Sequence, residues 1–324
     1  MNKKRWKTTA KVVFGLALLF TLLGMVDHAS LWDAVKTASP PLLIASFALF
    51  ASQGIFECGR LRIVFAGYGI GWIDSARLFL VGLFFGNFMP GMIGADVYQV
   101  QQMHAIRPGL IQPLSLSAFL RATGLVLNAI LAGTALLLGA GLAREDSHIA
   151  WESIGNNVPW TLICAGIAVL LLLTLGTAPG RRLGRTISSH VRHLLGESIR
   201  AVRSLTAGQQ VMLWLLGICV IFSRVFCYFL LLAAVGSSAT IAEILLAVTF
   251  TALAVIIPVS FAGLGIREAS LAAVLIVAGV EPAYAVAVSL ISRCYIWMLS
   301  IIGGTWFVLD RRAAVADTSA TTGD

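Results

Sequence analysis

The sequence predicts an all-α membrane protein, a polytopic helical bundle, and three observations support this fold class. Of its 324 residues, 58% are hydrophobic and only 12% are charged, and the mean hydropathy is +0.90. Soluble domains carry about 25% charged residues, because their surface needs polar cover. Apolar stretches near the length that crosses a ~30 Å hydrocarbon core also recur from end to end.

These apolar segments are each expected to form a helix in or across the membrane. The first follows a basic N-terminus and resembles a secretory signal. Since only Ala29-Ser30 offers a weak cleavage site, we expect a retained first helix with a cytoplasmic N-terminus. The segments lie at about 9–27, 40–57, 76–93, 113–142, 158–178, 210–235, 240–258, 268–280 and 283–309.

The lysines and arginines indicate how the segments are oriented, because cytoplasmic loops are enriched in both. If 76–93 and 240–258 turn back instead of crossing, 17 of the 23 basic residues lie on the cytoplasmic side. Only Lys36 and Arg144 then face outward. A fully crossing 76–93 would place the six arginines of 181–203 outside. In the favoured topology both termini are cytoplasmic, Arg60 counts among the cytoplasmic residues, and Arg121, Arg224, Arg267 and Arg293 fall at membrane depth.

The same topology predicts two inverted repeats, at about 40–142 and 210–309. Each contains a re-entrant broken helix pair, which enters from the cytoplasm in the first repeat and from outside in the second. Each repeat also presents an arginine, a proline, glycines with an acid, and a second arginine 25 residues after that acid. These landmarks are Arg60, Pro90, Asp96 and Arg121 in the first repeat and Arg224, Pro258, Glu268 and Arg293 in the second.

The chain is expected to form one membrane domain over 1–312, followed by a disordered cytoplasmic tail at 313–324. Between the repeats, 158–209 holds a further span and a basic amphipathic helix. In 181–205, apolar residues recur every three or four positions among six arginines. This pattern is typical of a helix that lies on an anionic lipid surface.

Ionisable side chains within hydrocarbon are costly, so they mark either a pathway or a functional pair. Proline and glycine break a helix, which is tolerated at membrane depth where protein or a watery cavity satisfies the freed backbone groups. Both repeats place such a break beside an acid, in 87–96 and in 258–268. Half-helix N-termini attract anions, and arginine offers a planar fork to phosphate. The candidate substrate-binding residues are Asn87, Pro90, Gly91, Gly94, Asp96, Arg121, Pro258, Ser260, Gly263, Gly265, Arg267, Glu268 and Arg293, with Arg60 and Arg224 as secondary candidates.

Two structural explanations of these residues stay open. The segment 258–268 is alternatively a membrane-edge loop with a local pair between Arg267 and Glu268. Arg121 and Arg293 alternatively neutralise the acids of the two repeats, within each repeat or across the two. Such pairing is compatible with a functional role.

Several kinds of chemistry find no support in the sequence. It holds no GxSxG, HExxH or Walker motif and no soluble portion large enough for a catalytic domain, so we expect no enzyme activity. The five cysteines are scattered, without CxxC or Cys/His spacing, so we expect neither a metal site nor a cofactor. The net charge of +8 indicates contact with lipid headgroups, not nucleic acid, because no basic segment adjoins a nucleic-acid-binding fold.

The chain resembles the lysylphosphatidylglycerol synthase transmembrane family, also called the flippase-like domain family, over about residues 10–310. The resemblance implies a membrane module that moves lipids or lipid-linked molecules between leaflets. Only a short polar tail follows Arg312, where bifunctional members carry a soluble aminoacyl-transferase domain, so we expect no synthase activity. The resemblance rests on Arg293 and on the stretches Asn87-Phe-Met-Pro90-Gly91-Met-Ile-Gly94-Ala-Asp96 and Pro258-Val-Ser260-Phe-Ala-Gly263-Leu-Gly265-Ile-Arg267-Glu268.

We therefore expect an integral protein of a bacterial inner (cytoplasmic) membrane whose partners are anionic or phosphate-bearing membrane lipids. A cavity at the repeat interface, lined by the two acids and the arginines that follow them, would hold a phosphate while acyl chains stay in lipid. Two other functions stay open. One is a non-transporting scaffold for a separate lipid-modifying enzyme, in which 181–205 or the tail matters most. The other is an ion-coupled small-solute transporter, in which Asp96 and Glu268 carry the coupling ion.

Overall fold

The computed structural model describes residues 17–24, 26–87, 93–141, 196, 205–255 and 263–321. The regular elements within these residues are helices, which confirms the all-α fold class for this part of the chain. They are α2 (His28–Lys36), α3 (Pro40–Val64), the short 3-10 helix η1 (Ala66–Tyr68), α4 (Trp72–Gly86), α5 (Ile93–Ile106), α6 (Ile111–Gly141), α11 (Ala207–Ala234), α12 (Ile241–Ala254), α13 (Ile266–Val277) and α14 (Pro282–Thr321).

Four of the described helices contain a stretch that is long and apolar enough to cross a membrane. A bent pair, Ala17–Gly24 with α2, meets at 90° and raises the number to five if it counts as one span. These helices fit the predicted membrane bundle. The four stretches are Pro40–Val64, Ile111–Ala135, Ala207–Ala234 and Pro282–Asp310.

Most of the predicted apolar segments overlap described helices, although α2 and most of α5 lie outside every predicted segment. One difference in bounds is at α3. The prediction ends this segment at 57, whereas α3 continues to Val64. Glu57 and Arg60 interrupt the apolar pattern, but both lie within the helix. Segment 158–178 and most of 181–205 lie outside the described residues. Helix α14 continues through 313–321, part of the segment predicted as a tail.

Side-chain caps explain where two of the helices begin. Thr206 before α11 accepts a hydrogen bond from the Gln209 N–H, and the Gln209 side chain accepts one from the Thr206 N–H. Thr240 and Glu243 make the same reciprocal pair at α12. Such capping boxes satisfy N–H groups that the first helical turn leaves free. Gly236, just after α11, has a φ of 81°, a conformation that favours glycine.

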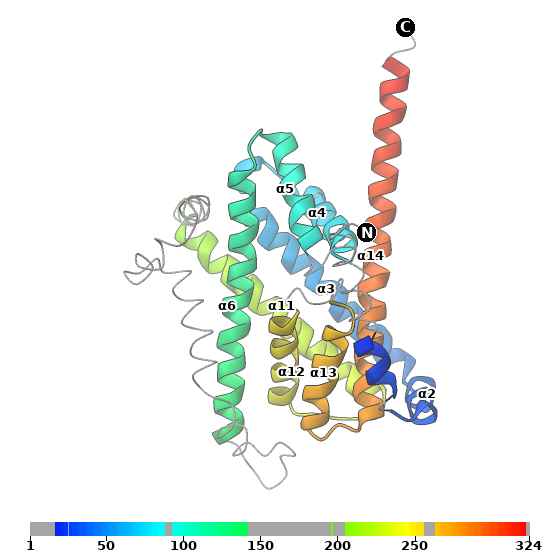
Figure 1. The fold of residues 1–324 in the computed structure, drawn as a ribbon. Coiled ribbons are helices and arrows are strands. Elements are labelled where there is room, and N and C mark those ends of the chain that lie inside the picture. Colours follow the sequence, from blue (N-terminus) through cyan, green and yellow to red (C-terminus); the bar gives the residue numbers. More distant parts are fainter. Residues whose placement is uncertain are drawn as a thin grey trace, which may run out of the picture.

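The bundle is organised around α3 and α11, which run side by side through its centre and pack on each other (Figure 1). Figure 1 shows two pairs of short helices at opposite ends, α4 with α5 in the upper half and α12 with α13 in the lower half. The long helices α6 and α14 stand on opposite sides. Helix α4 packs on α14, and α12 packs on α6.

Two glycines let the short helices lie close to their neighbours. A Cβ atom at Gly303 of α14 would clash with the Leu80 carbonyl oxygen of α4. A Cβ atom at Gly94 of α5 would clash with the Phe85 carbonyl oxygen at the end of α4. Small residues commonly allow membrane helices to approach in this way.

The outer surface of the bundle is apolar. Phe222, Phe226 and Phe229 of α11 and Ile301 of α14 are exposed. Exposed aromatic and aliphatic side chains at this density are unfavourable in water and suit contact with lipid chains. The polar side chains described next lie inside this apolar shell.

Candidate functional site

The most deeply buried ion pair among the described residues joins the first turn of α13 to α14. Arg293 Nε donates to Glu268 Oε1 at 2.6 Å, and the two side chains are 6% and 2% exposed. Glu268 Oε2 accepts the Gly265 N–H at 2.8 Å. Arg293 Nη2 also donates to the Gly263 carbonyl at 3.2 Å. The pair therefore holds the turn before α13 against α14.

Glycine is required in this turn for a backbone reason. Gly263 and Gly265 have φ values of 69° and 81°, which other residues rarely adopt. These values allow the Gly263 carbonyl to face Arg293 and the Gly265 N–H to face Glu268. The two glycines thus shape the turn that carries the acid.

The first half of the chain holds a corresponding pair between α5 and α6. Arg121 Nη2 lies 2.7 Å from Asp96 Oδ2, and the side chains are 37% and 24% exposed. Each acid is therefore paired with the arginine 25 residues later, within its own half. This observation agrees with one of the predicted alternatives. The local pair between Arg267 and Glu268 is wrong, because both Glu268 oxygens are engaged elsewhere.

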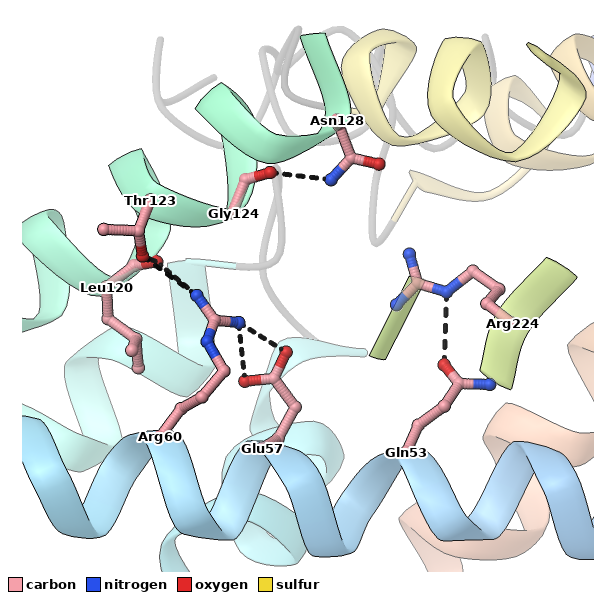
Figure 2. Close-up of polar contacts among 8 residues, drawn as sticks. All are labelled: Gln53, Glu57, Arg60, Leu120, Thr123, Gly124, Asn128 and Arg224. Atoms are coloured by element: carbon pink, nitrogen blue, oxygen red, sulfur yellow. Dashed lines mark hydrogen bonds and ion pairs between the residues drawn. The ribbon is translucent and has the colours of Figure 1, made fainter. Parts of the chain in front are cut away.

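A row of polar side chains follows one face of α3 at the centre of the bundle. Gln53, Glu57 and Arg60 are four and three residues apart, a spacing that places them on the same helix face. Arg60 Nη1 donates to both Glu57 oxygens at 2.9 and 3.0 Å (Figure 2). Arg60 Nη2 donates to Thr123 Oγ1 at 2.9 Å and to the Leu120 carbonyl at 3.2 Å, both on α6.

Arg60, which the predicted topology counts among the cytoplasmic residues, lies inside the helix bundle. Its side chain is buried, at 5% exposure, between α3 and α6. The charge is accommodated there because Glu57 neutralises it and Thr123 accepts one of its N–H groups.

Arg224 reaches the same polar row from α11. Its Nε donates to Gln53 Oε1 at 3.1 Å, as Figure 2 shows. Arg267, in the first turn of α13, donates from Nη2 to the Tyr228 hydroxyl at 3.4 Å. Tyr228 lies one turn after Arg224 on α11, so Arg224 and the hydroxyl that Arg267 contacts lie on the same face of that helix. The two arginines therefore belong to one cluster.

Sequence reasoning missed Gln53, Glu57, Thr123 and Tyr228. The spacing of Gln53, Glu57 and Arg60 in an apolar helix was a signal that could have identified the first two. Thr123 and Tyr228 carry no comparable signal, because isolated threonine and tyrosine residues are ordinary in membrane helices.

The remaining candidates divide into packing residues and residues outside the described part. Asn87 Nδ2 donates to Ser300 Oγ at 2.8 Å and so links the end of α4 to α14. Gly94 allows α5 to approach α4. Among the described residues, no group of three or more His, Cys, Asp or Glu side chains could hold a metal ion. Pro90, Gly91, Pro258 and Ser260 lie outside the described residues.

The comparison with protein families agrees with the resemblance and with the helical bundle. The family model described as "Lysylphosphatidylglycerol synthase TM region" matches residues 9–304, a range that includes both ion pairs and the polar row on α3. No curated protein and no solved structure matches the chain. With its apolar helices and this match, the chain belongs to the lysylphosphatidylglycerol synthase transmembrane-region family and is an integral membrane protein related to lipid handling.

Proposed function

We propose that this protein moves a phospholipid, or a lipid-linked polar headgroup, between the two leaflets of its membrane. The observation that carries the proposal is the charged centre of the bundle, where Arg60, Arg224 and Arg267 lie inside an apolar shell. Charged groups at membrane depth are costly and mark pathways. A headgroup needs such a pathway across the hydrocarbon, whereas its acyl chains can stay in lipid.

Two inverted repeats would supply this pathway, and the helix order supports them. Each half runs as a long helix, two short helices and a second long helix, α3 to α6 in one and α11 to α14 in the other. The contacts correspond as well, since α4 packs on α14 as α12 packs on α6. A two-fold axis through the contact of α3 with α11 would relate all of these pairs. Inverted-repeat transporters bind their substrates near such an axis.

The lengths of the short helices support re-entrant broken pairs. Helices α4, α5, α12 and α13 contain 15, 14, 14 and 12 residues. At 1.5 Å per residue they measure about 18 to 23 Å, less than the ~30 Å hydrocarbon core. We propose that α4 with α5, and α12 with α13, each enter the membrane and return on the same side.

The two ion pairs then have a mechanical role. Asp96–Arg121 ties α5 to α6, and Glu268–Arg293 ties α13 to α14. Each pair would make a short-helix hairpin move together with the long helix that follows it. Rocking of one repeat against the other could then open the charged centre to one leaflet at a time.

The pairing also bears on the alternative functions. An ion-coupled solute transporter needs Asp96 and Glu268 to take up a cation, and a carboxylate held by an arginine does so less readily. A scaffold for a lipid-modifying enzyme needs no charged centre. We therefore propose a lipid transporter without enzyme activity, whose partners are membrane lipids.

We also propose a location and orientation from the distribution of basic residues. The protein would lie in the inner membrane with both termini in the cytoplasm, and 181–205 would lie on its anionic surface. In this orientation the broken pair of the first repeat opens to the cytoplasm.

Lipid movement in proteoliposomes tests the function. The purified protein is reconstituted with a trace of headgroup-labelled phospholipid, and a membrane-impermeant quencher reports how fast inner-leaflet label reaches the outer leaflet. We expect the wild type to exceed protein-free liposomes, and Glu268→Gln and Arg293→Gln to lose most of that rate. Glu281→Gln is the matched control, because Glu281 is exposed between α13 and α14.

Two results would contradict the proposal. One is a wild-type rate no greater than that of protein-free liposomes. The other is a wild-type rate in both variants when equal amounts of inserted protein are compared. If deleting 181–205 or the tail abolished function in cells while lipid movement in liposomes was absent, the scaffold would be favoured instead.

A further inference from the structure

Two arginines approach each other in the centre of the bundle, and no acidic side chain within the described part of the chain forms an ion pair with either. Arg224 donates from Nε to Gln53 Oε1 at 3.1 Å. Arg267 donates from Nη2 to the Tyr228 hydroxyl at 3.4 Å, near the outer limit of a hydrogen bond. Arg224 and Tyr228 are one turn apart on α11, so both guanidinium groups lie on the same side of that helix and repel one another.

The acids near this arginine pair are already engaged. Glu57 also attracts Arg224, but both of its oxygens accept from Arg60 at 2.9 and 3.0 Å. Glu268 belongs to the buried pair with α14. The segments 88–92 and 256–262, which separate the short helices, contain no acidic residue. Among the described residues, the three guanidinium groups of Arg60, Arg224 and Arg267 therefore have one carboxylate, that of Glu57, in common.

Hydrogen-bond donors near the arginine pair are also unused. Arg267 Nε and Gln53 Nε2 are buried and have no acceptor among the described residues. Buried donors without acceptors are unfavourable, and like charges close together in a low-dielectric interior add to the penalty. Within the described part of the chain, the cluster therefore has less negative charge and fewer acceptor atoms than its guanidinium groups can use.

We propose that Arg224 and Arg267 form an anion site that binds a phosphate group, namely the headgroup phosphate of the transported lipid. The inference rests on the proposed function and names the part of the site that holds the cargo. A phosphate between the two arginines would neutralise like charges and accept the unused N–H groups. Arginine suits this task because its planar fork matches two phosphate oxygens.

This assignment differs from the one that the sequence favours. Arg121 and Arg293 are the expected phosphate ligands, yet each forms an ion pair with an acid. The charge of a paired arginine is already compensated, so it attracts a phosphate less strongly. The arginine pair of α11 and α13 carries the uncompensated charge.

The depth of the arginine pair also suits a headgroup in transit. Arg224 lies ten residues before the end of α11 at Ala234, or about 15 Å along the helix. This is about half of a ~30 Å hydrocarbon core, the level at which transporters of this architecture bind their substrates.

Lipid binding to the purified protein in detergent tests the inference. The probes are phosphatidylglycerol, inorganic phosphate, and a two-chain lipid whose headgroup is a trimethylammonium without phosphate. Affinity is measured by titration, and the unfolding temperature is recorded with and without each probe. The variants are Arg224→Gln, Arg267→Gln and Arg267→Lys, with Arg107→Gln as the control because Arg107 is exposed and lies over the Tyr68 ring.

The expected results separate the phosphate site from general attraction to lipid. Each glutamine variant should bind phosphatidylglycerol roughly tenfold or more weakly than wild type, since charge-assisted hydrogen bonds are lost. The affinity of Arg267→Lys for phosphatidylglycerol should lie between those of wild type and Arg267→Gln, because lysine keeps the positive charge but lacks the planar guanidinium group. Without lipid, the glutamine variants should unfold at the same or a higher temperature, since removing one of two like charges relieves repulsion. An unfolding temperature that is not lowered would show that weaker binding does not result from a failure to fold.

Several outcomes would overturn the inference. Equal affinity of wild type and both glutamine variants for phosphatidylglycerol excludes the site. Stabilisation by inorganic phosphate but not by phosphatidylglycerol assigns the site to a free anion and overturns the lipid assignment. If wild type moves lipid and both variants move it equally fast, the site is wrong although the function stands. If wild type moves no lipid but the variants lose phosphatidylglycerol binding, the transport function is wrong and the site stands.

Discussion

Replacing Arg293 by glutamine leaves the Glu268 carboxylate buried without its cation. The Glu268 side chain is 2% exposed and keeps one hydrogen bond, from the Gly265 N–H. Removing one partner of a buried ion pair typically costs about 3–5 kcal/mol, because the remaining charge stays desolvated. The hydrogen bond from Arg293 to the Gly263 carbonyl is lost as well. We therefore expect the free energy of unfolding to fall by about 3–5 kcal/mol.

Arg121→Gln provides the comparison at the corresponding position of the first half. The Asp96 and Arg121 side chains are 24% and 37% exposed, and we take that exposed part to face water in the pathway. An ion pair that water reaches contributes about 0–1 kcal/mol. The two variants should therefore differ in stability by at least about 2 kcal/mol.

Reversible unfolding in detergent measures both variants. Helix content is followed by circular dichroism as a denaturing detergent is added, and Glu268→Gln and the double variant Glu268→Gln/Arg293→Gln complete a double-mutant cycle. The double variant should be less destabilised than the sum of the single variants, since no unpaired charge remains. Equal destabilisation by Arg121→Gln and Arg293→Gln would refute the difference in water access, and additivity in the cycle would refute the coupling.

Three further predictions follow from local geometry. Gly303→Ala should destabilise the protein by about 1–3 kcal/mol, because its Cβ would clash with the Leu80 carbonyl oxygen. Gly133→Ala is the control and should not destabilise the protein, because its Cβ meets open space; thermal unfolding compares the two variants. Thr123→Val should lower the free energy of unfolding by about 1–3 kcal/mol, because it removes an acceptor of Arg60. Thr134→Val, at an exposed position of α6, is the control and should leave the stability unchanged in the same assay. In a background without the native cysteines, Ser238→Cys should react with a membrane-impermeant maleimide from outside, and Gly67→Cys only after permeabilisation; the reverse pattern would contradict the proposed topology.

Much of the fold follows from composition and periodicity, because a bilayer imposes simple rules. An apolar run of sufficient length must form a helix in hydrocarbon, since its backbone groups have no water to bind. This reasoning predicts a segment at 210–235 where α11 covers 207–234, and at 268–280 where α13 covers 266–277. It also identifies the acids and arginines that are expensive in lipid. The end of α3 was misjudged because Glu57 resembles the end of a span until its partner is known.

The pairing of these charges depends on tertiary structure. The spacing of 25 residues suggested that acids and arginines correspond, but whether they meet within a repeat, across repeats or next to each other depends on how α5, α6, α13 and α14 pack. The contact of Arg224 with Gln53 spans 171 residues of sequence, and no local pattern encodes it.

From the amino-acid order alone, this protein is a membrane bundle with a small set of costly charges, because hydrophobicity acts on each segment independently. Which charges are neutralised and which remain uncompensated is decided by the packed helices. Glu268 satisfies Arg293 in α14, whereas its sequence neighbour Arg267 turns toward Arg224 and Tyr228 on α11. Electrostatic compensation acts through space over a few ångströms, so only the fold determines where an anion is needed.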